Sequence, residues 1–140
     1  MLFVAKKLIM SKLNIEKWLS DFIETAKKHD FKNHIDLISK NISTYGMPGG
    51  KTLNYDDWKT RRKNELQSGL LKNLRYDKLC IKNIGLSRLI FKIEEIMDSL
   101  DGDHVVIHKN IILEQESDNK WRMVEESIKD WKVLNINNLT

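Results

Sequence analysis

The chain has 140 residues, of which 41% are hydrophobic and 31% charged, and its formal net charge is +4. This is the composition of one folded domain, and it excludes a disordered chain. The single cysteine, Cys80, excludes an internal disulfide, and no paired-cysteine metal site exists. We therefore expect a reducing, cytoplasmic setting with neither metal nor other cofactor.

The sequence also disfavours two kinds of partner. No apolar run is long enough to cross a membrane, so no membrane partner is expected. The basic residues are dispersed except in the short run at residues 59–63, which is typical of a solvated helix face and argues against a nucleic-acid partner.

The N-terminal half of the sequence predicts helices. Residues 1–13 mix apolar residues with lysines and are expected to form a flexible leader, followed by a single domain over residues 14–140. From residue 14 to 28 apolar residues recur at spacings of three and four, which predicts an amphipathic helix: Ile15, Trp18, Leu19, Phe22, Ile23 and Ala26. Asp30 is placed to cap a second short helix, 31–38.

A glycine loop, YGMPGGKT at residues 45–52, precedes a third helix, 55–68, which Asn54 caps and Gly69 closes. Its GKT ending resembles a phosphate-binding loop. However, the spacing is one residue short of that motif and the helix starts too late to meet a phosphate. One face of the helix carries Tyr55, Trp58, Arg62 and Leu66.

From residue 70 onward the hydrophobic period is two, which predicts strands at 72–83, 87–100, 104–116 and 120–132. Turn residues separate them, so we expect an antiparallel meander. Three helices followed by strands predict an α+β fold with a strongly curved antiparallel sheet.

A charged cluster is expected on the helix-covered face of this sheet. A three-residue loop at 101–103 puts Glu95 opposite Lys109, and a turn at 118–119 puts Glu126 diagonal to Lys109. The same registers pair Met97 with Ile107, Ile93 with Ile111, and Leu113 with both Phe91 and Val124. Buried charges need partners or a wet cavity, so the cluster predicts either a partly polar pocket or a structural ion pair.

The opposite face is expected to be mixed and partly aromatic, and we interpret it as a homodimer interface. Its main apolar residues are Ile90, Val106, Met123, Trp121 and Trp131. A monomer whose tryptophans cover strand ends is the alternative.

The order of elements resembles the nuclear transport factor 2-like superfamily, whose cone fold includes ketosteroid isomerases, scytalone dehydratase and polyketide-cyclase-like families. The matching features, spread over residues 14–132, are the Trp18 helix, the junction His29-Asp30-Phe31, the Pro48-Gly49-Gly50 loop and the closing strand at 120–125. The resemblance implies a pocket inside a cone and commonly a homodimer, but no single activity.

Three functions remain open. The first is a domain that binds a small anionic or carbonyl-bearing organic ligand, with Tyr45, Tyr55, Trp58 and Arg62 lining the pocket above the cluster. The second, implied by the resemblance, is a metal-independent isomerase or lyase, with Glu95 or Glu126 as the proton-transfer group, beside Lys109, and Tyr45, Tyr55 or Tyr76 as the donor. The third is an assembly module.

Overall fold

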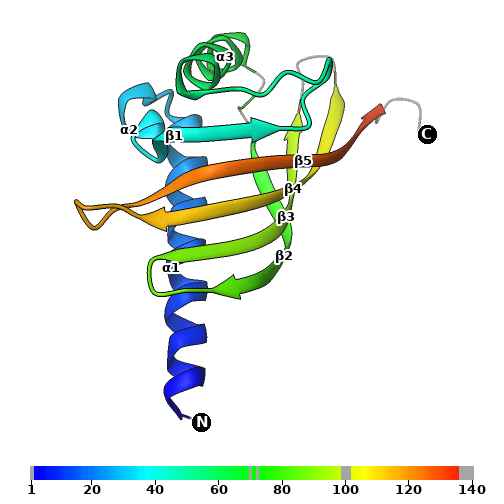
Figure 1. Ribbon diagram of the computed structural model, residues 1–140. Helices are drawn as coiled ribbons and strands as arrows, with labels where there is room; N and C mark the ends of the chain where they lie inside the picture. The colour runs from blue at the N-terminus through cyan, green and yellow to red at the C-terminus, as the bar shows by residue number, and fades with distance from the viewer. Residues whose placement is uncertain (1, 70, 72, 99–101, 136–140) are drawn as a thin grey trace.

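The structure is a computed structural model that describes residues 2–69, 71, 73–98 and 102–135 (Figure 1). Three helices and five strands follow one another along the chain: α1 (Leu2–Lys27), α2 (Phe31–Ile35), β1 (Ile38–Tyr45), α3 (Tyr55–Ser68), β2 (Arg75–Ile84), β3 (Arg88–Asp98), β4 (Asp103–Gln115) and β5 (Trp121–Asn135). The α+β architecture is thus as predicted.

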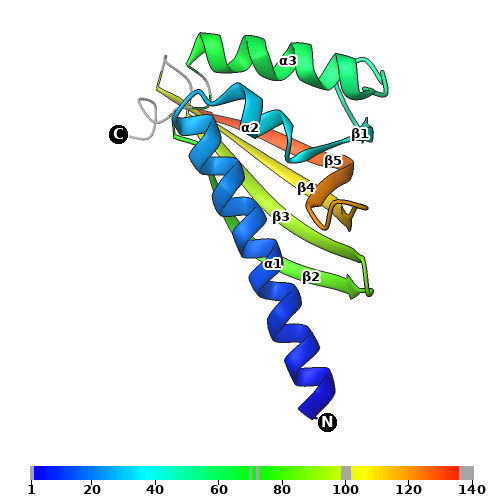
Figure 2. The same ribbon diagram turned by 90° about the vertical axis from the view of Figure 1, so that its left-hand side faces the viewer.

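Helix α1 begins twelve residues before its expected start at residue 14, because residues 2–13 continue the same helix. The buried stripe of α1 consists of residues at spacings of three and four. Figures 1 and 2 show that the N-terminal half of α1 projects past the edge of the sheet.

The caps of the other helices are those predicted. Asp30 caps α2, which ends at Ile35; of the expected helical residues 36–38, the first two instead connect to β1 and Ile38 begins it. Asn54 and Asp57 form a capping box at the start of α3, and Gly69 ends this helix in the left-handed conformation. The GKT triplet therefore precedes the helix and does not open it.

The five strands form one sheet in the order β1-β5-β4-β3-β2. β2 to β5 are the predicted antiparallel meander, but β1 adds to β5 in parallel, so the sheet is mixed rather than purely antiparallel. The helices cover one face of this curved sheet, and α1 crosses the strands (Figures 1 and 2). Aromatic residues of α1 and α3 and apolar residues of β3 and β4 form the core between them.

The predicted register of β3 on β4 is wrong by two residues. Glu95 pairs with Ile107, and Lys109 pairs with Ile93. A shift of two residues keeps every side chain on its face, so the buried set is unchanged. The expected loop at 101–103 and the expected strand residues 72, 99 and 100 include positions outside the described part of the chain.

Strand β5 carries two irregularities relative to β4. One lies between the pairs of Ile112 and Leu113, and the other between the pairs of His108 and Lys109. Glu126 pairs with Ile111 as predicted, whereas Leu113 pairs with Met123 and not with Val124. Each bulge adds one residue to β5, and the residues beyond it change face.

Candidate functional site

Lys109 lies at the centre of the charged cluster on the helix-covered face. Its Nζ donates hydrogen bonds of 2.7 Å to Glu95 Oε1 and 2.7 Å to Glu126 Oε2. All three side chains are buried, with 2% of each exposed. The structure therefore brings together the three residues that the sequence grouped, and direct contact leaves no space for a ligand between them.

Both carboxylates have further donors. Tyr76 donates to Glu95 at 2.6 Å, while Thr44 and the Trp58 indole donate to Glu126 Oε1 at 3.0 and 3.3 Å. These partners come from β2, β1 and α3, so the cluster joins the helix layer to the sheet.

The cluster holds both acids in the ionised form. Burial raises the pKa of Glu126, but Lys109 and the neighbouring arginines outweigh burial and lower it to about 2. Burial likewise raises the pKa of Glu95, and Lys109 and Arg62 reverse the direction, so that its pKa is also lowered. Burial and Glu95 raise the pKa of Tyr76 well above its usual value, which keeps this phenol protonated as a donor.

Arg62 of α3 lies deep inside the cone, with 1% of the residue exposed. Its guanidinium carbon lies 4.8 Å from the ring centre of Trp58 and 5.2 Å from that of Phe22. Its Nη1 lies 3.8 Å from a carboxylate oxygen of Glu65. However, Nε and Nη1 of Arg62 find no hydrogen-bond acceptor among the protein atoms.

His34 of α2 also belongs to this interior, and the sequence analysis missed it. The residue is fully buried, and its ring stacks on Phe22 with centroids 4.3 Å apart. Its Nδ1 lies 2.8 Å from Thr25 Oγ1, whose own hydrogen goes to a backbone carbonyl of α1. Nδ1 must therefore carry the proton, which leaves Nε2 as an acceptor without a partner in the protein.

Burial, together with Arg62, lowers the pKa of His34 to about 3, so the ring is neutral near pH 7. A signal for this residue was present in the sequence. His34 follows Phe31 by three positions, so the two lie on the same side of the predicted second helix.

The other expected pocket residues are placed less centrally. Trp58 is fully buried, whereas Tyr45 is 42% exposed at the end of β1. Tyr55 is partly buried at the first turn of α3, with Lys59 Nζ 5.9 Å from its ring centre. Of the three tyrosines considered as donors, Tyr76 is the one that contacts a cluster carboxylate.

The expected interface on the opposite face of the sheet needs correction. Trp121 packs against the core, and Met123 is 1% exposed within it, so both lie on the helix-covered face. Trp131 pairs with the buried Ile107 and therefore shares that face too, although it is 56% exposed. The bulges of β5 cause these changes of face.

What remains on the opposite face is largely polar. Ile90 and Val106 are partly buried there. Beside them His108 contacts Glu94 at 2.9 Å and also contacts Asp130. The carboxylates of Asp130 and Glu94 accept hydrogen bonds from the protonated ring and so raise the pKa of His108. The two tryptophans that suggested an interface are absent from this face.

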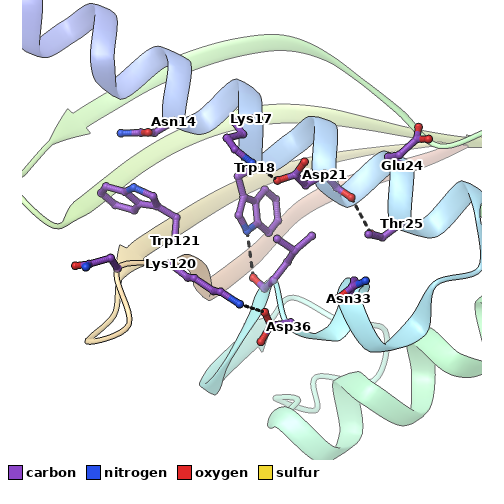
Figure 3. A pocket seen from close by; sticks show the side chains of 12 residues that line it. Asn14, Lys17, Trp18, Asp21, Glu24, Thr25, Asn33, Asp36, Lys120 and Trp121 are labelled. Carbon is purple, nitrogen blue, oxygen red and sulfur yellow. Dashed lines mark hydrogen bonds and ion pairs between the residues drawn. The ribbon is translucent and has the colours of Figure 1, made fainter.

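A surface groove of about 430 Å³ lies between α1, the α2–β1 connection and the β4–β5 turn (Figure 3). Trp18, Leu37 and Trp121 form its apolar part, and the Trp18 indole donates to the Leu37 carbonyl at 3.1 Å. Lys120 reaches across to Asp36 at 2.9 Å. Thr25 lines the groove and also contacts His34, so it lies in the wall between groove and interior.

A metal site is absent from the described part of the chain: among these residues, no group of three or more histidine, cysteine, aspartate or glutamate side chains is arranged to hold a metal ion. Within that same part of the chain, no helix has the length and apolar character to cross a bilayer.

Comparison with known proteins shows the fold. No family model matches the sequence, and no curated protein matches it. Among solved structures, a candidate scytalone dehydratase from Novosphingobium aromaticivorans superposes with a TM-score of 0.73 at 10% identity, covering 94% of this chain and 91% of that one. A nuclear transport factor 2-like protein of unknown function from Shewanella oneidensis gives 0.72 at 14% identity, covering 85% and 98%.

A hexachlorocyclohexane dehydrochlorinase, LinA type 2, gives a TM-score of 0.65 at 12% identity and covers 93% of each chain. Other similar structures are described as having a cystatin-like fold. The resemblance noted in the sequence is thereby confirmed at the level of fold: the chain has the nuclear transport factor 2-like cone fold. Proteins of this fold include enzymes and proteins of unknown function.

Proposed function

We propose that this protein binds a small, uncharged, carbonyl-bearing organic molecule inside the cone, beneath α3. One observation carries the proposal: Arg62 Nε and Nη1 and His34 Nε2 are buried polar atoms without hydrogen-bond partners in the protein. Buried polar groups are almost always paired with protein atoms, ordered water or a ligand, and a bound molecule would supply partners to these atoms. A carbonyl oxygen accepts from Arg62, and a hydroxyl on the same molecule donates to His34.

The two residues are close enough to share one ligand. Phe22 and Trp58 contact both of them: the ring centres of Phe22 and Trp58 lie 4.3 and 6.1 Å from that of His34 and 5.2 and 4.8 Å from the guanidinium carbon of Arg62. These aromatic rings supply the apolar contact that small-ligand sites combine with a few polar groups.

The charge balance favours a neutral ligand over an anionic one. Three cations, Arg61, Arg62 and Lys109, face three carboxylates, Glu65, Glu95 and Glu126. His34 is neutral because of its low pKa. An anion would add an uncompensated charge to a buried site, which is costly.

Proton-transfer catalysis has less support. A general base works best when its pKa is near the working pH, whereas Glu126 has a pKa of about 2 and both carboxylates are bound to Lys109. The names of two structural neighbours, a candidate scytalone dehydratase and a dehydrochlorinase, refer to enzymes. They support a pocket for a small organic molecule in this fold, but no catalytic residue is carried over at 10 to 12% identity. A role in assembly alone does not explain the unpaired buried polar atoms of Arg62 and His34.

The test uses two matched probes, 4-hydroxycyclohexanone and 4-hydroxycyclohexanecarboxylate, titrated into ¹⁵N-labelled protein. We expect 4-hydroxycyclohexanone to shift the side-chain signals of Arg62 and His34, with the carboxylate binding at least tenfold more weakly. Arg62→Lys keeps the charge but removes the Nε donor, and it should weaken 4-hydroxycyclohexanone binding about tenfold, whereas the exposed Arg88→Lys should not. Absence of shifts at either residue, or equal binding by Arg62→Lys, would refute the proposal.

A further inference from the structure

The projecting half of α1 carries exposed apolar side chains. Ile9 is 58% exposed and Leu13 is 53% exposed, and both belong to the N-terminal half of α1, the half that projects past the edge of the sheet (Figures 1 and 2). A helix with apolar residues on its solvent side is under-packed as a single copy. The feature is independent of the ligand site, which lies at the other end of α1.

These two residues belong to a second stripe on α1, distinct from the one that contacts the sheet. The sheet-facing stripe includes Ser11 and Ile15, which are 6% and 0% exposed. The second stripe is Lys6, Ile9, Leu13 and Glu16, whose spacings of three, four and three residues are those of a coiled-coil seam. At about 100° per residue, this seam lies roughly opposite Ile15 on the helix.

The charges of the seam identify its occupant. We propose that residues 6–16 of α1 pair antiparallel with the same residues of a second copy of this chain, about a two-fold axis that lies on the seam side of α1 at the level of residue 11. In two antiparallel helices, the numbers of facing residues have a constant sum. In this register Ile9 of each copy therefore meets Leu13 of the other, and Lys6 of each copy meets Glu16 of the other.

The pairing is self-complementary in both apolar contact and charge, as a two-fold interface requires. Glu16 can form this ion pair at little cost, since its present contact with Lys12 of the same helix is 3.8 Å long and exposed to solvent. An anionic membrane fits less well, because Glu16 lies on the same stripe as the apolar residues. The interface is small, so the dimer is weak and concentration-dependent.

The experiment is sedimentation equilibrium of the full chain from roughly 10 to 300 µM, a range suited to a weak dimer. We expect the molar mass to rise from 16.5 kDa toward twice that value. Leu13→Asp should weaken association at least tenfold. Leu8→Asp is the matched control, because Leu8 is 47% exposed on the same projecting segment but off the seam, and it should change association less than twofold.

Exchanging the charges of Lys6 and Glu16 distinguishes this register from nonspecific hydrophobic association. Lys6→Glu and Glu16→Lys should each weaken the dimer several-fold, and the double variant should restore it to within about twofold of the wild type. Circular dichroism checks that each variant keeps its helix content. A monomer at all concentrations, equal effects of Leu13→Asp and Leu8→Asp, or no rescue by the double variant would each overturn the proposal.

Vesicles of phosphatidylcholine and phosphatidylglycerol test the remaining occupant. Flotation of a monomeric wild-type chain with these vesicles, lost in Leu13→Asp, would assign the seam to a lipid surface and would also overturn the proposal. No co-flotation supports the pairing of two copies.

Discussion

Replacement of Lys109 by methionine tests the energetics of the buried cluster. The substitution keeps most of the side-chain volume but leaves Glu95 and Glu126 facing each other without their shared cation, which now lies 2.7 Å from each. Removing one partner of a buried ion pair costs about 3–5 kcal/mol. Since a domain of this size is stable by about 5–15 kcal/mol, we expect Lys109→Met to remain folded only marginally at pH 7.

The pH dependence gives a second, independent value for the contribution of the cluster to the free energy of unfolding. In the native protein the pKa of Glu126 is about 2, below its ordinary value of 4.5. This group therefore contributes stability that is complete above pH 4.5 and is lost as the pH falls toward 2. The difference corresponds to about 3 kcal/mol at about 1.4 kcal/mol per pKa unit.

In Lys109→Met the effect of pH on the stability contributed by the two carboxylates is reversed. Without Lys109, burial and mutual repulsion raise the pKa of Glu95 and Glu126, so their destabilising effect is greatest at neutral pH and fades as they take up protons. The gap in stability between wild type and Lys109→Met should therefore narrow by about 2–3 kcal/mol between pH 7 and pH 4.

Urea denaturation at several pH values, followed by circular dichroism, measures both quantities. Lys92→Met is the control, because Lys92 lies exposed on the opposite face of the same sheet, and it should cost less than about 0.5 kcal/mol. If Lys109→Met proved too unstable to measure, adding Glu95→Gln should recover part of the loss. A gap that stays constant between pH 7 and pH 4, or equal costs at the two lysines, would refute the reasoning.

Two further predictions concern the backbone and a buried histidine. Gly46→Ala should cost more than about 2 kcal/mol in urea denaturation, since Gly46 has φ +80° and an added Cβ would lie 2.1 Å from the Ile128 carbonyl oxygen. Gly49→Ala, also at positive φ but with open space around it, should cost only about 1 kcal/mol, and equal costs would contradict the close approach. Because burial lowers the pKa of His34 to about 3, the wild type should lose about 2 kcal/mol relative to His34→Gln between pH 6.5 and pH 5. Parallel stability curves for these two proteins would show that His34 takes up its proton in the native state.

The capped ends of the helices were predicted correctly because the signals that determine them are local. Asp30, Asn54 and Gly69 all cap helices where their chemistry indicated. The start of α1 was misplaced because the lysines of the N-terminal segment suggested a solvated leader. Lysine is a good helix former, and the helix continues through it.

The charged cluster was found in spite of a wrong register. A two-residue error between β3 and β4 preserves the face of Glu95 and Lys109, and long side chains reach diagonal partners as well as direct ones. The tryptophans were misplaced because alternation alone cannot detect a bulge. Each extra residue of β5 reverses the alternation beyond it, so Trp121 and Trp131 changed face.

The parallel addition of β1 was not predicted because it depends on contacts far apart in the sequence. Ile38 pairs with Met123, and the Arg122 side chain reaches Asp36 at 3.0 Å. No local pattern specifies such pairing. His34 was missed for a related reason, since its role depends on residues of α1 and α3 that gather around it only in the folded chain.

The pairing of β1 with β5 also sets the order in which the protein can be completed during synthesis. α1 and β1 leave the ribosome first, whereas β5, the strand beside which β1 lies, is made last. Until then the apolar stripe of α1 has no complete sheet to cover it, and the nascent chain offers this stripe to chaperones or to other chains. Folding is therefore expected to be slow for a domain of this length, because its closing contacts join strands that are far apart in the sequence.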